Sequence, residues 1–109
     1  MVEKRVRRFD VWLVSLDPTQ GSEIQKTRPC VIVSPDEMAA LKTAIVAPMT
    51  SRGFDYPTRI RCTFQGKAGL ILLDQIRAVD KSRLVRKVGA ISPSARIKTM
   101  ACLQELFAY

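Results

Sequence analysis

Short apolar segments that each end in a cluster of polar residues constrain the fold of this chain most. The apolar segment Asp10–Leu16 is followed by the polar run Asp17–Glu23 and, after four further residues, by Arg28-Pro29. The same order recurs in Ala47–Ser51 and in Leu73–Arg77. Segments of this kind predict strands, and their polar ends predict turns. Three such strand ends in one small chain therefore predict a sheet with a single composite site at its edge.

The length of 109 residues fits one domain that buries its own core, so we expect residues 1–109 to fold as a single unit. An apolar content of 47% indicates a packed globule rather than a disordered chain. No segment approaches the roughly 20 apolar residues that a membrane helix needs, and Met1–Arg8 lacks the apolar core of a secretory signal. We therefore expect no membrane partner.

The three cysteines Cys30, Cys62 and Cys102 lie far apart and are flanked by apolar residues. This arrangement is typical of reduced core thiols in the cytoplasm rather than of a disulfide or zinc framework. The chain has no histidine and no Cys-x-x-Cys pair, which argues against a metal site or another cofactor. Any phosphate chemistry must then rest on arginine, carboxylate and hydroxyl groups.

The net charge is strongly positive, with 18 Lys and Arg against 10 Asp and Glu, or +8. Such an excess favours polyanionic partners, such as nucleic acid or an acidic protein segment, although a solubility surface gives the same count. Arg59 and Arg61 alternate with apolar residues and would project from one face of a strand. Further basic residues gather in Lys4–Arg8 and Lys81–Lys87. A basic stripe on a sheet favours nucleic acid.

Apolar periodicity and chain breakers predict five or six strands, a short inserted helix and a C-terminal helix. Ser34 and Pro35 would start the inserted helix, which would run to about Leu41. Ser92-Pro93 would start the C-terminal helix, whose apolar residues lie on one face. The expected fold is a mostly antiparallel, barrel-like α+β domain. The expected strands are 10–16, 29–34, 43–47 (ended by Pro48), 58–64, 68–73 and about 85–91.

Seven short motifs, which follow one another along the chain, resemble those of a known family. With them, the chain resembles the MazF/PemK family of bacterial toxins. The similarity runs from about Phe9 to the final helix with near-uniform spacing; the ordered set is specific, although any one motif alone is weak. The motifs are Asp10-Val11-Trp12, Asp17-Pro18-Thr19, Gly21-Ser22-Glu23, Thr27-Arg28-Pro29, Ile45–Ser51, Asp74–Arg77 and Val79–Leu84.

The resemblance implies an SH3-like barrel, which the family shares with the gyrase poison CcdB. It also implies a homodimeric, sequence-specific and metal-independent endoribonuclease of a type II toxin–antitoxin system. Members of the family cleave single-stranded RNA to leave a 2′,3′-cyclic phosphate and a 5′-hydroxyl, and an acidic antitoxin silences them. The expected partners are therefore single-stranded RNA such as mRNA, a cognate acidic antitoxin and a second copy of the chain.

The resemblance places the key arginine of the family at Arg28 and the key threonine or serine at Thr50. A guanidinium fits a phosphate as a planar fork of donors, and a hydroxyl can orient a non-bridging oxygen. The alternatives are a salt bridge from Arg28 to Glu23 or Asp74, and a strand-end cap at Thr50. Glu23 and Asp74 are both candidates for the general base, and Asp74 could equally accept backbone donors in the turn that follows it.

Other polar residues are candidates for contacts with RNA. Gln75 and Arg77 have donors suited to base edges and phosphates, or equally to a network that holds a loop or a dimer. Phe9 and Ile24–Lys26 replace glycines that are common in the family, so the RNA sequence preference of the family does not transfer. The candidate RNA-binding residues are Ser22, Lys26, Ser51, Arg59, Arg61, Gln75 and Arg77.

Two other functions compete with an endoribonuclease. One is a CcdB-like poison that grips a topoisomerase through the C-terminal helix, and the other is a non-catalytic RNA-binding module. The pairing of Arg28 with Thr50 argues against the gyrase poison, which has no need of a phosphate clamp. It does not separate the endoribonuclease from the non-catalytic module.

Overall fold

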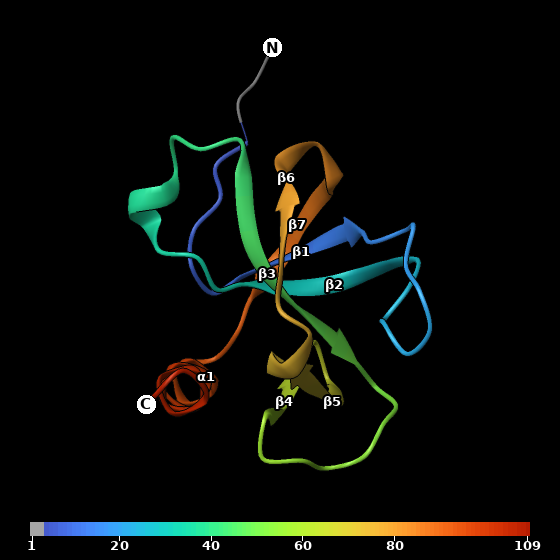
Figure 1. The fold of residues 1–109 in the computed structure, drawn as a ribbon, viewed down its shortest axis with the longest axis vertical. Coiled ribbons are helices and arrows are strands. Elements are labelled where there is room, and N and C mark those ends of the chain that lie inside the picture. The colour runs from blue at the N-terminus through green and yellow to red at the C-terminus, as the bar shows by residue number, and fades with distance from the viewer. Residues whose placement is uncertain (1–3) are drawn as a thin grey trace.

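The computed structural model describes residues 4–109, whose main elements are seven antiparallel strands and a C-terminal helix (Figure 1). The strand order is β4-β5-β3-β2-β1-β7, and β6 also pairs with β3. The mostly-β, barrel-like fold predicted from the sequence is confirmed. The elements are β1 (Asp10–Ser15), β2 (Thr27–Ile32), η1 (Asp36–Met38), β3 (Thr43–Thr50), β4 (Arg59–Phe64), β5 (Lys67–Leu72), η2 (Leu73–Gln75), β6 (Arg77–Asp80), η3 (Lys81–Arg83), β7 (Leu84–Ala90) and α1 (Pro93–Leu106).

The curled sheet buries apolar side chains on both faces. Val11 and Val31 belong to one apolar cluster, whereas their neighbours Trp12 and Ile32 belong to another. Because successive side chains of a strand point to opposite faces, strands buried on both sides consist of nearly continuous apolar residues. Helix α1 packs on the first cluster through Ala95. Each fully buried aliphatic side chain contributes on the order of 2 kcal/mol.

β3 changes its partner along one edge, and this change opens the sheet. Thr43 to Val46 pair with β6, whereas Met49 and Thr50 pair with β5. The predicted end of this strand at Pro48 is wrong, because the strand continues through the proline. The ladder between β2 and β3 extends only as far as the pair of Cys30 and Pro48. A residue without a backbone N–H is tolerated there because the ladder stops at that point.

Other parts of the secondary structure also differ from the sequence prediction. The inserted helix is a single 3₁₀ turn, η1, because the Ser34 hydroxyl accepts the backbone N–H of Ile45 (3.1 Å) instead of capping a longer helix. β2 begins at Thr27, two residues earlier than expected, so Arg28 lies within a strand. The four-residue strand β6 was not predicted. Its last residue, Asp80, caps the following 3₁₀ turn by accepting the backbone N–H of Ser82 (2.9 Å).

The start of α1 agrees with the sequence prediction, whereas the prediction of three core thiols agrees only in part, because Cys30 is buried but Cys62 and Cys102 are half-buried. The Ser92 side chain accepts the backbone N–H of Ala95, and Pro93 occupies the first turn. All three cysteines are free. Burial raises the pKa of the Cys30 thiol to about 12, which makes it an unreactive core residue.

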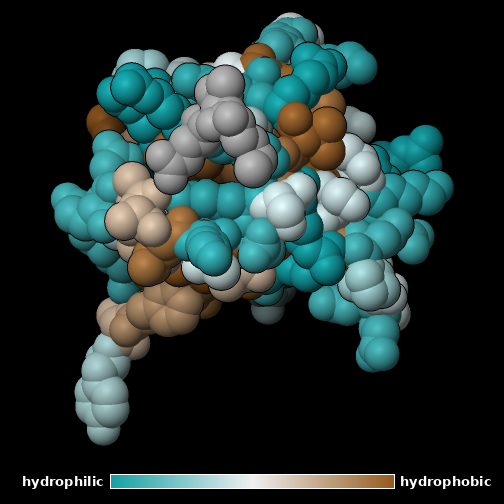
Figure 2. All heavy atoms as spheres, turned by 90° about the horizontal axis from the view of Figure 1, so that it is seen from above, coloured by the Kyte–Doolittle hydropathy of each residue, from teal (hydrophilic) through white to brown (hydrophobic). Residues whose placement is uncertain are grey.

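Hydrophilic side chains cover most of the face shown in Figure 2, with apolar side chains in separate small groups. Within residues 4–109, no helix has both the length and the apolar character that crossing a membrane requires.

Gly69 allows β5 to run close to the end of β3. A Cβ atom at this position would lie 2.7 Å from the carbonyl oxygen of Thr50, closer than real side chains approach backbone. The next residue, Leu70, pairs with Thr50. The absence of a side chain at position 69 therefore sets where the end of β3 lies.

We predict that Gly69→Ala forces β3 and β5 apart and lowers the free energy of unfolding by about 1–3 kcal/mol. Urea denaturation measures the loss, and amide hydrogen exchange should become faster at Thr50 and Leu70. Gly66→Ala is the control, since its Cβ would meet no atom within 4 Å and the cost comes from its φ of +78° alone. Unchanged exchange at Thr50 in the Gly69 variant would contradict the close-approach interpretation.

Candidate active site

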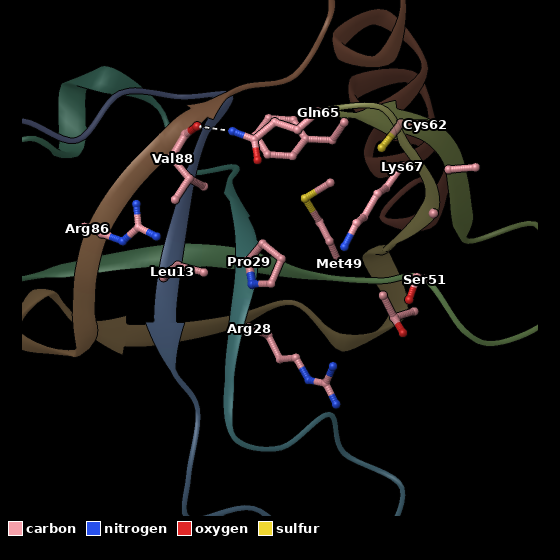
Figure 3. A pocket seen from close by; sticks show the side chains of 14 residues that line it. Leu13, Arg28, Pro29, Met49, Ser51, Cys62, Gln65, Lys67, Arg86 and Val88 are labelled. Atoms are coloured by element: carbon pink, nitrogen blue, oxygen red, sulfur yellow. Dashed lines mark hydrogen bonds between the residues drawn. The ribbon is translucent and has the colours of Figure 1, made fainter.

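A cavity of about 360 Å³ lies where the ladder between β2 and β3 ends, next to the pairing of β3 with β5 along its other edge (Figure 3). In the antiparallel ladder of β2 and β3, Ile32 pairs with Val46 and Cys30 with Pro48. Continuing this register by two residues places Arg28 across from Thr50, in the fork between the strands. The lining residues are Leu13, Arg28, Pro29, Met49, Thr50, Ser51, Cys62, Phe64, Gln65, Lys67, Ala68, Gly69, Arg86 and Val88.

Arg28 presents an exposed guanidinium to this cavity (Figure 3). Its Nε donates to the carbonyl oxygen of Gln25 (3.2 Å), which steadies the side chain while leaving the terminal nitrogens for other acceptors. Among residues 4–109, no salt bridge involves Arg28. The alternative pairing with Glu23 or Asp74 is therefore not formed, and the guanidinium can receive an anion.

Thr50 is half-buried at the end of β3, and its Oγ1 accepts the backbone N–H of Arg52 (3.1 Å). This is the strand-end cap considered as the alternative role. The bond uses a lone pair of the hydroxyl and leaves its proton to donate to another oxygen. Ser51, a candidate RNA-binding residue, lines the same cavity as Thr50, because the chain leaves the strand after Thr50.

Two further cationic residues, which were not among the site residues predicted from the sequence, line the cavity. Lys67 begins β5, and Arg86 lies on β7 opposite Leu13 of β1. In Figure 3 the amine of Lys67 extends into the opening above Arg28. Gln65 donates to the carbonyl oxygen of Val88 (2.8 Å) and ties the β4–β5 turn to β7. The cavity thus carries three cationic side chains, and no carboxylate is among its lining residues.

The loop between β1 and β2, residues 16–26, carries the predicted residues Ser22, Glu23 and Lys26 outside the lining of the cavity. All three are exposed. One oxygen of Glu23 accepts the backbone N–H of Gln20 (2.6 Å). Its second oxygen has no hydrogen bond to any of residues 4–109 and is open to solvent.

Gln75 and Arg77 hold this loop in place. The side-chain oxygen of Gln75 accepts the backbone N–H of Ile24 (2.8 Å), and its nitrogen donates to the carbonyl oxygen of Ser22 (3.4 Å). Arg77 donates to the carbonyl oxygen of Leu16 (3.1 Å) at the start of the loop. These contacts correspond to the loop-holding network that was the alternative to RNA binding.

Asp74 lies outside the cavity and pairs with Arg59, whose Nε and Nη2 donate to its two oxygens (3.2 and 3.3 Å). Thr58 also donates to this carboxylate (3.1 Å). Partial burial raises the pKa of the Asp74 carboxyl. Hydrogen bonds from Arg59, from its own backbone and from Thr58, together with the charge of Arg59, lower this pKa by more than burial raises it. Its pKa therefore lies below the ordinary 3.8.

The predicted basic stripe on β4 is thus paired with acidic residues. Arg59 bonds to Asp74, and Arg61 forms an exposed salt bridge with Asp55. Neither arginine lines the cavity. Within residues 4–109, no group of three or more His, Cys, Asp or Glu side chains is placed to hold a metal ion.

Comparisons with known proteins point to one family. The sequence profile described as PemK-like, MazF-like toxin of type II toxin-antitoxin system matches residues 7–107. A protein of Staphylococcus epidermidis named Endoribonuclease MazF is 34% identical over 100 residues, which cover 85% of this chain and 83% of the relative.

Solved structures share the fold at lower identity. The crystal structure of MazF from Deinococcus radiodurans has a TM-score of 0.82 at 22% identity, covering 94% of this chain and 96% of the other. An endoribonuclease in complex with its cognate antitoxin from Mycobacterial species has a TM-score of 0.79 at 18% identity, with coverage of 95% and 98%.

We predict that Asp74→Asn lowers the free energy of unfolding by about 0.5–1 kcal/mol at neutral pH, because the ion pair with Arg59 is partly exposed. A lowered folded-state pKa stabilises the fold above the ordinary value of 3.8 and loses this effect as the pH falls through the lowered pKa. The difference in urea midpoint between wild type and variant should therefore shrink in acid. In the control, Asp55→Asn, the lost salt bridge is exposed and the midpoint should stay nearly unchanged at every pH. A constant difference for Asp74→Asn across the pH range would contradict the electrostatic cause.

Proposed function

This chain belongs to the family of PemK-like, MazF-like toxins of type II toxin–antitoxin systems, and on that premise we propose that it is a metal-independent, sequence-specific endoribonuclease. The supporting observation is the convergence of Arg28 and Thr50 on one exposed, cationic cavity. The Staphylococcus epidermidis relative, which bears the name of an endoribonuclease, supports the same activity. The proposed substrate is single-stranded RNA, in particular mRNA in the cytoplasm.

The proposed reaction is attack of a ribose 2′-hydroxyl on the adjacent phosphodiester. It needs a base for that hydroxyl, a proton for the departing 5′-oxygen and positive charge beside the phosphate. The products are a 2′,3′-cyclic phosphate and a 5′-hydroxyl. We assign the stabilisation of the phosphate to Arg28, because its terminal nitrogens are open and its charge is permanent.

Thr50 donates its hydroxyl proton to a non-bridging phosphate oxygen in this proposal. The bond from the Arg52 N–H fixes the orientation of the hydroxyl before substrate arrives, so little reorganisation is needed. Lys67, Arg86 and Ser51 line the same cavity and would attract and hold the RNA backbone.

We propose Glu23 rather than Asp74 as the general base. Both oxygens of Asp74 accept hydrogen bonds, and its lowered pKa makes it a weak proton acceptor. Glu23 has one oxygen open and lies on the loop that leads into Arg28. Bending of this loop toward the cavity on RNA binding would complete the site.

The proposed partners are a second copy of the chain and an acidic antitoxin. The net charge of +8 and the cationic cavity favour an extended acidic segment that competes with RNA for the same surface. In the proposed homodimer, RNA binds in the groove between the protomers. Size-exclusion chromatography with light scattering measures the dimer directly.

We predict that the purified protein cleaves single-stranded RNA in EDTA and leaves cyclic-phosphate ends. Arg28→Ala should lower the cleavage rate by about 10²–10³-fold. Thr50→Val should lower the cleavage rate by more than Thr50→Ser does, because serine keeps the hydroxyl. Arg5→Ala and Thr63→Val are matched controls, because both residues are exposed and lie outside the cavity. Mass spectrometry of the fragments identifies the ends.

Two outcomes would replace the proposed activity. Tight RNA binding without scission would make the chain a non-catalytic RNA-binding module. DNA breaks that require gyrase, with RNA left intact, would make it a CcdB-like poison.

A second prediction separates the two carboxylates. Glu23→Gln should lower kcat by about 10²–10⁴-fold and remove the acidic limb of the pH–rate profile, because a general base is lost. Asp74→Asn should keep that limb, whatever its effect on KM. The reverse result, an acidic limb lost only in the Asp74 variant, would assign the base to Asp74.

A further inference from the structure

Two aromatic side chains project from the loop between β3 and β4 without a packing role in the core. Phe54 is 66% exposed and Tyr56 is 58% exposed. Their rings meet edge to face, with centroids 6.4 Å apart and planes at 88°. The loop swings away from the sheet below the end of β3 (Figure 1). Exposed aromatic pairs bury little apolar area, so their placement indicates a ligand rather than fold stability.

The ring of Phe54 is held from one side. The guanidinium of Arg59 lies 4.6 Å from the ring centroid, and its Nη1 donates to the carbonyl oxygen of Phe54 (3.5 Å). Arg59 is itself fixed by its two bonds to Asp74. One face of the ring is therefore covered by a fixed cation, and the Phe54 side chain is still 66% exposed to a ligand.

The aromatic pair is next to the candidate active site. Gly53 has a φ of +119°, and a Cβ built on it would lie 3.9 Å from Cγ2 of Thr50. The loop therefore folds back against Thr50, and Phe54 is the next residue along the chain. A ligand on the exposed part of Phe54 would adjoin a ligand bound at Thr50.

We propose that Phe54 and Tyr56 form a stacking platform for one unpaired base of the RNA, next to the phosphate held by Arg28 and Thr50. This inference rests on the proposed function and adds the site that reads or holds a base. An unpaired base offers a flat π-face, and stacking on aromatic side chains is the usual way in which single strands are held. Asp55, which lies between Phe54 and Tyr56 in the sequence, is paired with Arg61, so it does not leave a free negative charge facing the RNA backbone.

Charge argues for RNA rather than an apolar protein surface as the occupant. The platform adjoins a cavity with three cationic side chains, and a cation lies directly behind Phe54. An anionic strand with flat bases matches both features. An apolar partner would leave the three cations of the cavity without a counter-charge.

The test is a binding measurement with an RNA that cannot be cut. A 2′-O-methyl RNA of about 12 nucleotides, selected for binding from a random pool, is prepared with one base at a time removed. We expect one position at which base removal weakens binding to wild type by about tenfold, with no such effect in Phe54→Ala. Phe54→Tyr should behave like wild type and Phe54→Leu like the alanine variant, because stacking needs an aromatic ring. Val85→Ala, a change at an equally exposed apolar residue on β7, should keep wild-type binding.

Three results would overturn the platform. These are an equal loss on base removal in wild type and Phe54→Ala at every position, full binding by Phe54→Leu, and reduced self-association of Phe54→Ala with unchanged RNA affinity. Since the probe has no reactive 2′-hydroxyl, the result does not depend on catalysis. A protein that binds through the platform but cuts no RNA would refute the endonuclease proposal and leave the platform standing.

Discussion

The partner change of β3 is the constraint on which the candidate site depends. Along one edge β3 pairs first with β6 and then with β5, and along the other its ladder with β2 ends at Pro48, so the sheet opens between Arg28 on β2 and Thr50 on β3. Two residues without ordinary backbone properties make this possible. Pro48 has no N–H where the ladder ends, and Gly69 has no Cβ where β5 meets the carbonyl of Thr50. The cavity is thus a consequence of strand pairing, and rigid strands rather than loops position its two central side chains.

Electrostatics divide the surface around this fork into two parts. Arg28, Lys67 and Arg86 line the cavity with no carboxylate among its lining residues, which favours an anion. Outside it, Arg59 and Arg61 are paired with Asp74 and Asp55. The net charge alone does not reveal this division, because it counts open and paired cations alike. What matters for a phosphate ligand is the group of open cations at the fork.

The sequence predicted the parts of the site that depend on local motifs. The family motifs select Arg28, which lies near the start of β2, and Thr50, which ends β3, and the structure brings both to one cavity. Lys67 and Arg86 were not predicted as site residues. Arg86 reaches the cavity through the pairing of β7 with β1, and no local pattern encodes this contact between distant segments. The inserted helix was overestimated for a similar reason: the Ser34 hydroxyl bonds to Ile45 on another strand. The four-residue strand β6 has one buried residue, Val79. A strand this short shows no alternation of apolar and polar residues that could be recognised.

The short segment η2 links the two loops that flank the cavity. Asp74 fixes Arg59, which covers Phe54 in the β3–β4 loop, and the adjacent Gln75 bonds to Ile24 and Ser22 in the β1–β2 loop. Both polar side chains of η2 are therefore occupied in holding loops. Under the proposed function their contribution to the reaction is indirect, because they set the position of the groups that meet RNA, whereas Arg28 and Thr50 meet the phosphate itself. Substrate affinity and chemistry would then reside in separate residues, joined through one turn of the chain.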